Sequence, residues 1–303
     1  MRLRHIEVFH AVYTYGSITS AAKFLNVSQP SVSKVLAHAE QQLGYPLFDR
    51  IKGKVVPTLE AERLIGHVSR VFQSIDELQR VSKNIAAADT GKIRIAVTPA
   101  FGIDVVPSAV AAYLQLHPET EFLIETLHYQ QVIRALNQSR IDIGIAFHPS
   151  SVSGIAIDHL ATAEFVAVTD SGYQVRRGKR VKLEEIQKLP FIRLNESGPL
   201  GQLLNSELEA SGLEFKSAVR EETYQVAKAL VAHGAGVTLI DELTARSSGH
   251  PNVRAYRLDP ELRFNIGLMR LESTPLSIVS QRFVRFVSDH VRNFLRKPLN
   301  ERP

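Results

Sequence analysis

Residues 17–50 read SITSAAKFLNVSQPSVSKVLAHAEQQLGYPLFDR, and this stretch decides the architecture of the N-terminal part of the chain. Its apolar residues recur at helical spacing in two segments, Ile18–Leu25 and Val32–Leu43. The pair Asn26-Val27 makes a tight break between them. Two short helices joined by such a turn are how a chain builds a probe for the DNA major groove.

The second predicted helix begins with small polar residues. We expect Ser28 to cap it by accepting a hydrogen bond from a free first-turn N–H, and Ser17 to cap the helix before it. Pro30 falls in the first turn, where its missing N–H does no harm. The helical spacing leaves five polar side chains facing outward: Gln29, Ser31, Ser33, Lys34 and His38.

These outward side chains have the chemistry of a DNA-reading surface. Glutamine can read adenine edges, serine can bond to base edges or phosphate, and lysine neutralises phosphate. The helix N-terminus itself favours anions. An ordinary amphipathic helix with a solvated polar face carries the same pattern, so the helix alone leaves both interpretations open. The flanking segments favour DNA binding.

Another amphipathic helix precedes this stretch, and a basic hairpin follows it. The preceding helix ends near Gly16, and its apolar positions are Leu3, Ile6, Phe9, Val12 and Tyr13. Residues 49–58 read DRIKGKVVPT, which predicts a short hairpin with Gly53 at its turn. Residues 1–57 hold seven Lys/Arg and three acids, so they carry about +4 of the chain's formal net charge of +5. Such a wing can lie along a phosphate backbone or reach the minor groove.

Residues 1–58 resemble the winged helix-turn-helix of LysR-type transcriptional regulators. The resemblance rests on LRHIEVFHAVYTYGSITSAAKFLNVSQPSVSKVLAHAEQQLGYPLFDR and the VVPT run that follows it. The remaining residues are similar to that family in length and organisation, so the resemblance covers essentially the whole chain. It implies double-stranded promoter or operator DNA as a partner. The residues expected to contact that DNA are Ser28, Gln29, Pro30, Ser31, Ser33, Lys34, His38, Arg50, Lys52 and Lys54.

Residues 59–89 predict a long helix with one apolar face. Its apolar residues are spaced by alternating steps of four and three, which is a heptad seam with Ser82 as its polar interruption. The seam comprises Leu64, Val68, Val71, Ile75, Leu78 and Ile85. Packing on the chain's own C-terminal domain would also cover this face. We favour dimerisation, because two DNA-reading heads match a roughly palindromic site. The resemblance implies a dimerising linker helix and a homotetramer.

Residues 90–303 alternate between predicted strands and helices, which indicates an α/β domain with a parallel sheet. The pattern restarts near Glu164, so we interpret the region as two lobes with crossings near Leu160–Glu164 and Phe264–Gly267. Lobe one comprises residues 90–161 and 267–303, and lobe two comprises residues 162–266. The resemblance implies the same fold class, an effector-binding domain like the two-lobed periplasmic binding proteins.

Ligands of open α/β sheets bind beyond the carboxyl ends of the strands, at helix N-termini. Free N–H groups and hydroxyls there suit a carboxylate, so we expect a small organic acid. The expected effector-binding residues are Thr98, Pro99, Ala100, Phe101, Tyr129, Phe147, His148, Asn195, Glu196, Ser197, Gly198, Thr223 and Tyr224.

Plainer roles exist for many of these residues. Thr98, Ser197 and Thr223 suit simple helix caps, the aromatic residues suit the core, and His148 suits a loop or hinge. Glu196 does not suit an anionic ligand, but it suits an amine, which leaves an amino-acid-like effector open. Asp241 stands where the family often has a proline.

Composition and motifs exclude several kinds of site. The 303 residues include no cysteine, which excludes disulfides, thiolate metal sites and Cys nucleophiles. Gly234-Ala235-Gly236 precedes a predicted strand, so it is not a dinucleotide fingerprint. No metal-ligand spacing, nucleophile elbow or phosphate loop is found, so we expect no metal, no cofactor and no enzymatic activity. No apolar run is long enough to span a membrane and no signal segment is seen, which predicts a soluble, cytoplasmic protein.

Three functions compete on these observations. The leading one is a sequence-specific transcriptional regulator switched by a small-molecule effector. A small-molecule enzyme is disfavoured by the missing catalytic constellation, and a solute receptor for transport is disfavoured by the missing signal peptide.

Overall fold

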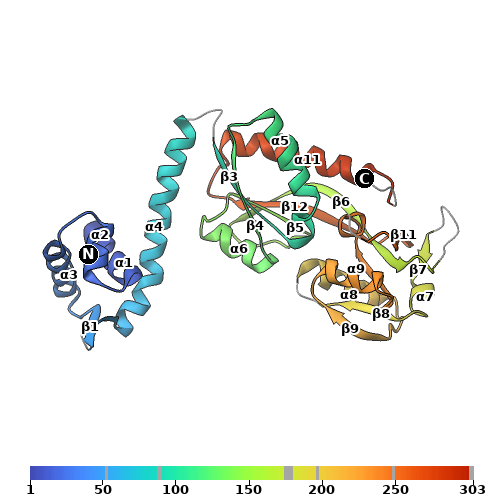
Figure 1. Cartoon of the computed structure of the whole chain (residues 1–303), viewed down its shortest axis with the longest axis horizontal. Helices are drawn as coiled ribbons and strands as arrows, with labels where there is room; N and C mark the ends of the chain where they lie inside the picture. Colours follow the sequence, from blue (N-terminus) through green and yellow to red (C-terminus); the bar gives the residue numbers. More distant parts are fainter. Residues whose placement is uncertain (52–53, 87–90, 174–179, 196–197, 248–249, 300–303) are drawn as a thin grey trace. The chain divides into compact units, whose positions relative to one another are not determined.

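The computed structural model of the chain describes residues 1–51, 54–86, 91–173, 180–195, 198–247 and 250–299. For residues 54, 73, 76, 77 and 79–86 it describes the backbone alone. The chain divides into two compact units, Met1–Arg80 and Val81–Pro303 (Figure 1).

The N-terminal unit combines three helices with a two-stranded hairpin and the start of a long helix. Its elements are α1 (Leu3–Tyr15), α2 (Ile18–Phe24), α3 (Gln29–Leu43), β1 (Phe48–Ile51), β2 (Lys54–Pro57) and α4 (Leu59–Ala86). The apolar faces of the helices meet in one core, where Phe9, Val12, Ala21, Val32 and Leu36 are all buried. The winged helix-turn-helix predicted from the sequence is therefore confirmed.

The two helix caps predicted in this unit turn out differently. The Ser17 hydroxyl accepts a hydrogen bond from the Ser20 N–H at 3.0 Å, as expected. Ser28 makes no side-chain cap bond, so that prediction was wrong. Pro30 brings no N–H to the first turn, and the N–H of Ser31 donates instead to the Ser28 carbonyl at 3.0 Å. The Ser28 residue is exposed at the start of α3.

The predicted heptad seam divides into two parts along α4. Leu64 and Val68 pack into the core of the chain's own N-terminal unit, where Val68 is 3% exposed. This corrects the expectation that they are free to face a second subunit. Val71 and Leu78 remain exposed, at 38% and 70%, and Ile75 is half-buried. The side chains of Ser82 and Ile85 lie outside the described residues.

The larger unit is built on one ten-stranded sheet. Its main path runs β4-β3-β5-β12-β6-β10-β8-β9; off this path, β11 pairs with β6 and β7 pairs with β11. Parallel pairs dominate within each lobe: β3 pairs with β4 and β5, and β8 pairs with β9 and β10. The strands are β3 (Lys92–Val97), β4 (Glu121–Thr126), β5 (Ile143–Phe147), β6 (Ile155–Asp170), β7 (Val181–Lys182), β8 (Phe191–Leu194), β9 (Ser217–Glu221), β10 (Val237–Asp241), β11 (Val253–Asp259) and β12 (Arg263–Leu271).

Two long antiparallel strands carry the chain between the lobes. The Ile155–Glu164 half of β6 pairs with β12, and the following half pairs with β10 and β11. Both predicted crossings lie in this β6–β12 ladder, where Phe264 pairs with Ala163. The Phe264 ring contacts Phe147 and Phe165, with ring centroids 5.2 and 4.9 Å apart. The two lobes therefore share one continuous apolar core.

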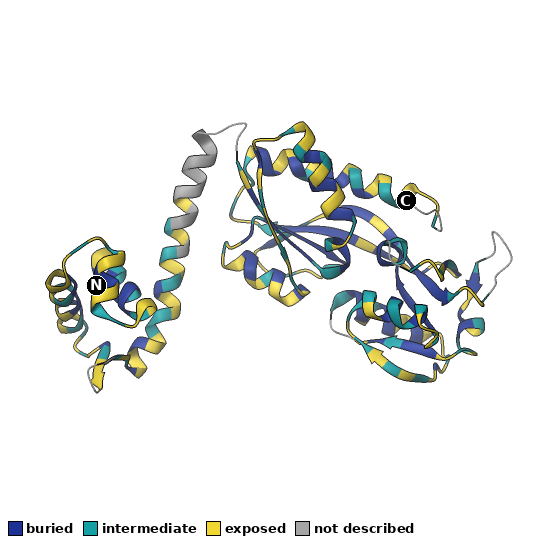
Figure 2. Cartoon of the chain, viewed as in Figure 1, coloured by how far each residue is buried: buried dark blue, intermediate teal, exposed yellow. Residues whose placement is uncertain are grey.

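Helices cover the sheet on both faces. Alternation along β3 sends Ile93, Ile95 and Val97 into the core under α5 and α11, whereas Ala96 lies in a separate core under α6. Every residue of β5 and β10 is buried, whereas β6 and β12 keep some exposed positions (Figure 2). The helices are η1 (Pro99–Gly102, a 3-10 helix), α5 (Val105–Leu116), α6 (Tyr129–Asn137), α7 (Leu183–Ile186), α8 (Pro199–Ala210), α9 (Tyr224–Ala232), α10 (Glu242–Arg246) and α11 (Ile278–Arg296).

A buried ion pair reinforces the crossing. Glu242 and Arg246 of α10 lie 2.8 Å apart, with side chains that are 4% and 5% exposed. Glu242 also accepts the N–H of Glu164 at 3.0 Å. Arg246 donates to the carbonyl of Leu295 at 3.2 Å, near the end of α11. Because α10 follows a lobe-two strand and α11 packs on lobe one, these bonds join the lobes beside the ladder.

The exposed part of the α4 seam generates a prediction about assembly. We expect the double variant Val71→Glu/Leu78→Glu to lower the mass of the full chain in sedimentation, because paired carboxylates cannot be buried at a helix–helix seam. Arg70→Glu is the control. It changes the net charge by the same two units, and its side chain lies about 100° around the helix from Val71. An unchanged mass for the double variant would show that this stripe is not an oligomer interface.

Candidate functional site

The outward face of α3 presents the polar residues expected to meet DNA. Gln29, Ser31 and Lys34 are exposed, and Ser33 is half-buried. The Gln29 amide donates to the Ser33 hydroxyl at 3.1 Å, so these two side chains are linked one turn apart on the same face. Gln29 must exchange this internal bond for a base-edge bond if it reads DNA.

His38 differs from the other residues of this face because it has a buried partner. Its Nδ1 lies 3.1 Å from Nε2 of His5, and His5 is 5% exposed. Burial and the neighbouring His38 lower the pKa of His5. One nitrogen of His38 is therefore already engaged within the protein.

The wing is the β1–β2 hairpin. Arg50 is exposed on β1 and pairs across the hairpin with Val55, and Ile51 pairs with Lys54. This register places Arg50 and Lys54 one position apart across the two strands. Lys52 and Gly53 lie outside the described residues, as does the side chain of Lys54.

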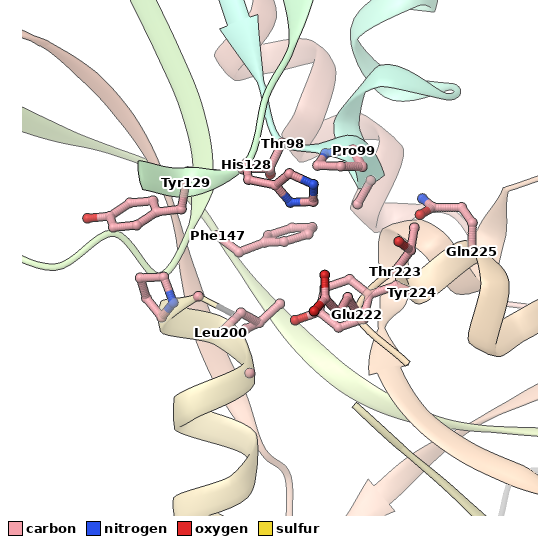
Figure 3. Close-up of a pocket in the computed structure, with 14 residues that line it drawn as sticks. Thr98, Pro99, His128, Tyr129, Phe147, Leu200, Glu222, Thr223, Tyr224 and Gln225 are labelled. Carbon is pink, nitrogen blue, oxygen red and sulfur yellow. The ribbon is translucent and has the colours of Figure 1, made fainter. Parts of the chain in front are cut away.

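The larger unit contains a pocket between its two lobes, shown in Figure 3. Its empty volume is about 570 Å³ when the open mouth is included. The N-terminal ends of η1, α6, α8 and α9 all lie at this pocket. The lining residues are Thr98, Pro99, Ala100, His128, Tyr129, Phe147, Gly198, Pro199, Leu200, Gly201, Glu222, Thr223, Tyr224 and Gln225.

Eight of the residues expected from the sequence meet in this pocket. They lie at or just after the carboxyl ends of the parallel strands β3, β4, β5, β8 and β9, and the two halves of the sheet bring these ends to the cleft. These eight are Thr98, Pro99, Ala100, Tyr129, Phe147, Gly198, Thr223 and Tyr224.

Other expected residues do not line the pocket. Phe101 is fully buried and packs on Phe147 with centroids 4.4 Å apart, because its place in η1 turns it into the core. His148 adopts a positive φ of 43° after β5, and its N–H donates to the Asn265 carbonyl at the crossing. Asn195 lies just behind the lining, with its amide nitrogen 3.5 Å from the Glu222 carboxylate. Glu196 and Ser197 lie outside the described residues.

Six further residues line the pocket beyond the expected effector-binding set: His128, Pro199, Leu200, Gly201, Glu222 and Gln225. His128 directly precedes Tyr129 at the start of α6, and Glu222 directly precedes Thr223 at the start of α9. The position directly before each expected residue at the start of α6 and α9 would therefore have pointed to both. Pro199 to Gly201 form the first turn of α8, and Gln225 belongs to the first turn of α9.

The polar groups of the pocket are helix N–H groups, hydroxyls, the His128 ring, the Gln225 amide and the Glu222 carboxylate. First-turn N–H groups of α6, α8 and α9 have no acceptor within their own helices. The Thr98 hydroxyl is buried and has no hydrogen-bond partner in the described part of the chain. The Tyr129 hydroxyl is already used, because it accepts the N–H of Ser150 at 3.1 Å. A ligand with acceptor oxygens near Thr98 would satisfy donors that the protein leaves open.

Family models match both parts of the chain. The model for the bacterial regulatory helix-turn-helix protein, lysR family, matches residues 3–62, and the LysR substrate binding domain matches residues 86–292. The chain belongs to the LysR family. It is a DNA-binding transcriptional regulator with an effector-binding domain.

Individual relatives of this LysR-family regulator match along its whole length. The chain is 39% identical to the HTH-type transcriptional regulator DgcR of Pseudoalteromonas sp, over 95% of this chain and 99% of that protein. It is 27% identical to the transcriptional activator protein LysR of Escherichia coli (strain K12), over 98% and 94%.

Solved structures of LysR-family regulators share the fold. Full-length CbnR complexed with its target DNA matches with a TM-score of 0.66 and 21% identity, covering 96% of this chain and 100% of that one. A full-length OxyR from Pseudomonas aeruginosa matches with a TM-score of 0.68 and 16% identity, covering 100% and 99%. Among the residues that the structure describes, no three or more His, Cys, Asp or Glu side chains are grouped so that they could bind a metal ion. None of the described helices has the length and apolar character needed to cross a membrane.

Asp241 lies at the junction between β10 and α10. It ends β10, is fully buried, and caps α10 by accepting the Thr244 N–H at 2.8 Å. Its other carboxylate oxygen has no partner among the described residues. Burial raises the pKa of Asp241 to about 6, and burial and Asp241 together raise the pKa of Tyr224 in the pocket wall.

A buried lysine lies on the same side of the pocket wall. Lys228 of α9 is 3% exposed, and its ammonium donates to the carbonyls of Thr244 and Ala245, each at 3.0 Å. Burial lowers the pKa of Lys228 to about 8. Asp241 and Lys228 therefore secure the two ends of the short helix α10, one at its start and one at its end.

The raised pKa of Asp241 predicts a pH-dependent stability. The pKa of Asp241 is about 6 in the folded state and 3.8 ordinarily. As the pH rises from about 4 through 6, ionisation of this buried carboxyl therefore lowers the free energy of unfolding. We expect the free energy of unfolding of Asp241→Asn to exceed that of the wild type by about 1–3 kcal/mol at pH 8. At pH 4 the two free energies of unfolding should be equal.

Urea unfolding of both proteins at the two pH values checks this. Asp289→Asn is the control, because that side chain is 74% exposed and should change stability little at either pH. Equal stability of Asp241→Asn and the wild type at pH 8 would contradict the prediction.

Proposed function

We propose that this regulator binds a specific operator through α3 and the wing, and that a small organic acid bound between the lobes switches its activity. In this proposal residues 1–58 form the DNA-binding domain, residues 59–89 the dimerising linker helix, and residues 90–303 the effector domain. The active form is a homodimer through α4 that assembles into a homotetramer. No chemistry is performed on the effector.

The unsatisfied Thr98 hydroxyl is the observation that carries the effector proposal. It is a buried polar atom without a partner among the described residues, and Thr98 lines a pocket where helix starts from both lobes converge. Buried polar groups in native proteins almost always have partners, so an open one in a pocket marks a place for ligand atoms. Helix N-termini favour anions, and a carboxylate accepts several N–H and O–H bonds at once.

The arrangement of the lobes supports a switching role for the same pocket. Pocket residues come from both lobes: Thr98 and Phe147 from one, Thr223 and Tyr224 from the other. A ligand that bonds to both sides favours the arrangement in which the lobes lie closer together. It can shift that equilibrium only by its differential affinity for the two arrangements, and the shift would then alter the geometry of the assembled regulator and its bound DNA.

We expect Gln29 to contact base edges and Arg50 to contact phosphates, and the two kinds of contact predict different effects of mutation. Gln29→Ala is expected to weaken binding to the preferred site by about 1–3 kcal/mol and to leave non-specific binding unchanged. Arg50→Ala is expected to weaken binding to every sequence and to lower the salt slope by about one.

Fluorescence anisotropy on a site selected from a random duplex library measures both effects. Gln42→Ala is the matched control, since Gln42 is exposed on the same helix but near its C-terminal end. Unchanged affinity in both Gln29→Ala and Arg50→Ala would remove this surface from the DNA interface.

The effector proposal is tested by a hydroxyl deletion of nearly constant volume. A thermal-shift panel of small aliphatic, aromatic and amino carboxylic acids identifies a stabilising ligand, and calorimetry then gives its affinity. Thr98→Val is expected to weaken that binding by about 1.5–3 kcal/mol, since it removes a hydrogen bond to a charged group. Affinity for DNA without ligand should stay near that of the wild type.

Thr120→Val is the matched control for this experiment. Its hydroxyl is also buried without a partner in the described part of the chain, but it precedes β4 at the opposite edge of the sheet. It should bind the ligand as the wild type does. Equal affinity of Thr98→Val and wild type would remove Thr98 from the site, and turnover of the ligand would overturn the non-enzymatic role.

A further inference from the structure

We infer that the effector carries an amino group beside its carboxylate, and that Glu222 binds this ammonium. The inference rests on the proposed effector pocket and names the chemical class of its ligand: an α-amino acid or a close derivative. The observation that carries it is a carboxylate in a pocket whose other polar groups favour an anion.

Glu222 stands at the junction between β9 and α9. It follows the last residue of β9, Glu221, and precedes Thr223, the N-cap of α9. Its carboxylate lines the pocket, and Figure 3 shows it directed toward the space beside Phe147. The one bond to it within the described residues is the long contact from the Asn195 amide, at 3.5 Å. No Lys or Arg of that part of the chain forms an ion pair with it.

The charges of the described lining are unbalanced for a simple organic acid. The lining includes no Lys or Arg, so its anion-binding groups are the helix N-termini, the hydroxyls, the Gln225 amide and the His128 ring. Glu222 is an exposed residue of the same lining, and its negative charge opposes the binding of a second carboxylate. A ligand with both a carboxylate and an ammonium satisfies both features, because each of its charges meets an opposite partner.

The neighbouring groups suit the two ends of such a ligand. The carboxyl and amino groups of an α-amino acid are attached to one carbon, so their binding groups must be close together. Glu222 adjoins Thr223 and the first-turn N–H groups of Tyr224 and Gln225 in the sequence. The ammonium and the carboxylate can therefore engage the same helix start, with Thr98 approaching from the other lobe. Pro99, Phe147 and Leu200 offer an apolar surface for the rest of the molecule.

Glu222 has one plainer role, because a carboxylate just before a helix N-terminus interacts favourably with the helix dipole. That role affects the stability of α9 and gives no preference for amines. The two roles are therefore separated by ligand preference, whereas stability alone does not separate them.

The experiment uses the full chain and matched pairs of probes. Each pair consists of an α-amino acid, tested in both configurations, and the carboxylic acid of the same carbon skeleton without the amino group. Calorimetry on the wild type is expected to show at least one pair in which the amino acid binds about ten-fold or more tightly than its partner. Glu222→Gln keeps the size and hydrogen-bonding capacity of the side chain, and it should lose that preference.

Two further variants test whether the preference for amines depends on Glu222 in particular. Glu214→Gln makes the same charge change on an exposed residue after the far end of α8, and it should keep the preference of the wild type. Thr98→Val should weaken both members of each pair alike.

The outcomes separate the two proposals. Carboxylates that bind without regard to the amino group, with the same affinity in Glu222→Gln, would overturn the role of Glu222 and leave the carboxylate pocket standing. A preference for amines that survives in Glu222→Gln would also overturn it. Failure of every carboxylate and amino acid to bind would overturn the carboxylate pocket itself.

Discussion

The antiparallel ladder between β6 and β12 is the interaction on which the effector domain depends. Residues Ile155–Glu164 of β6 pair with β12, and the same strand continues past Phe165 into the sheet of the other lobe. The register of one ladder therefore sets the position of both lobes. A slip by one residue would turn Phe264 and Ile266 from the buried face to the opposite one, so the apolar pattern holds this register firmly.

The pocket is a consequence of this arrangement. Each half of the sheet is mainly parallel, so within each lobe the carboxyl ends of strands lie at one edge and the following helices start there. The shared strands bring these two edges together, and helix starts from both lobes meet across a small cavity. The Glu242–Arg246 pair holds the lobes beside the ladder and leaves the cavity open. Binding groups from both lobes can then respond to one ligand.

In the N-terminal unit, the stability of the core depends on the long helix α4. Its core is small, and α4 completes it by contributing Val68 and the partly buried Leu64. The same helix then continues with an exposed apolar stripe. Exposure of such a stripe to water is unfavourable, and a second protein surface that covers it removes this cost. One helix thus stabilises the DNA-reading head with its first turns and offers an assembly surface with its later ones.

The sequence by itself determined the elements and the shared edge of the site. Local periodicity and helix caps such as Ser17 are encoded over a few residues, and Thr98, Phe147 and Thr223 follow strands whose carboxyl ends must meet in a parallel sheet. Only the tertiary structure decided which side chains are free. Phe101 turns into the core, Val68 is covered by its own unit, and Glu222 joins the cavity. These outcomes depend on contacts between segments far apart in the chain, and short-range patterns do not contain them.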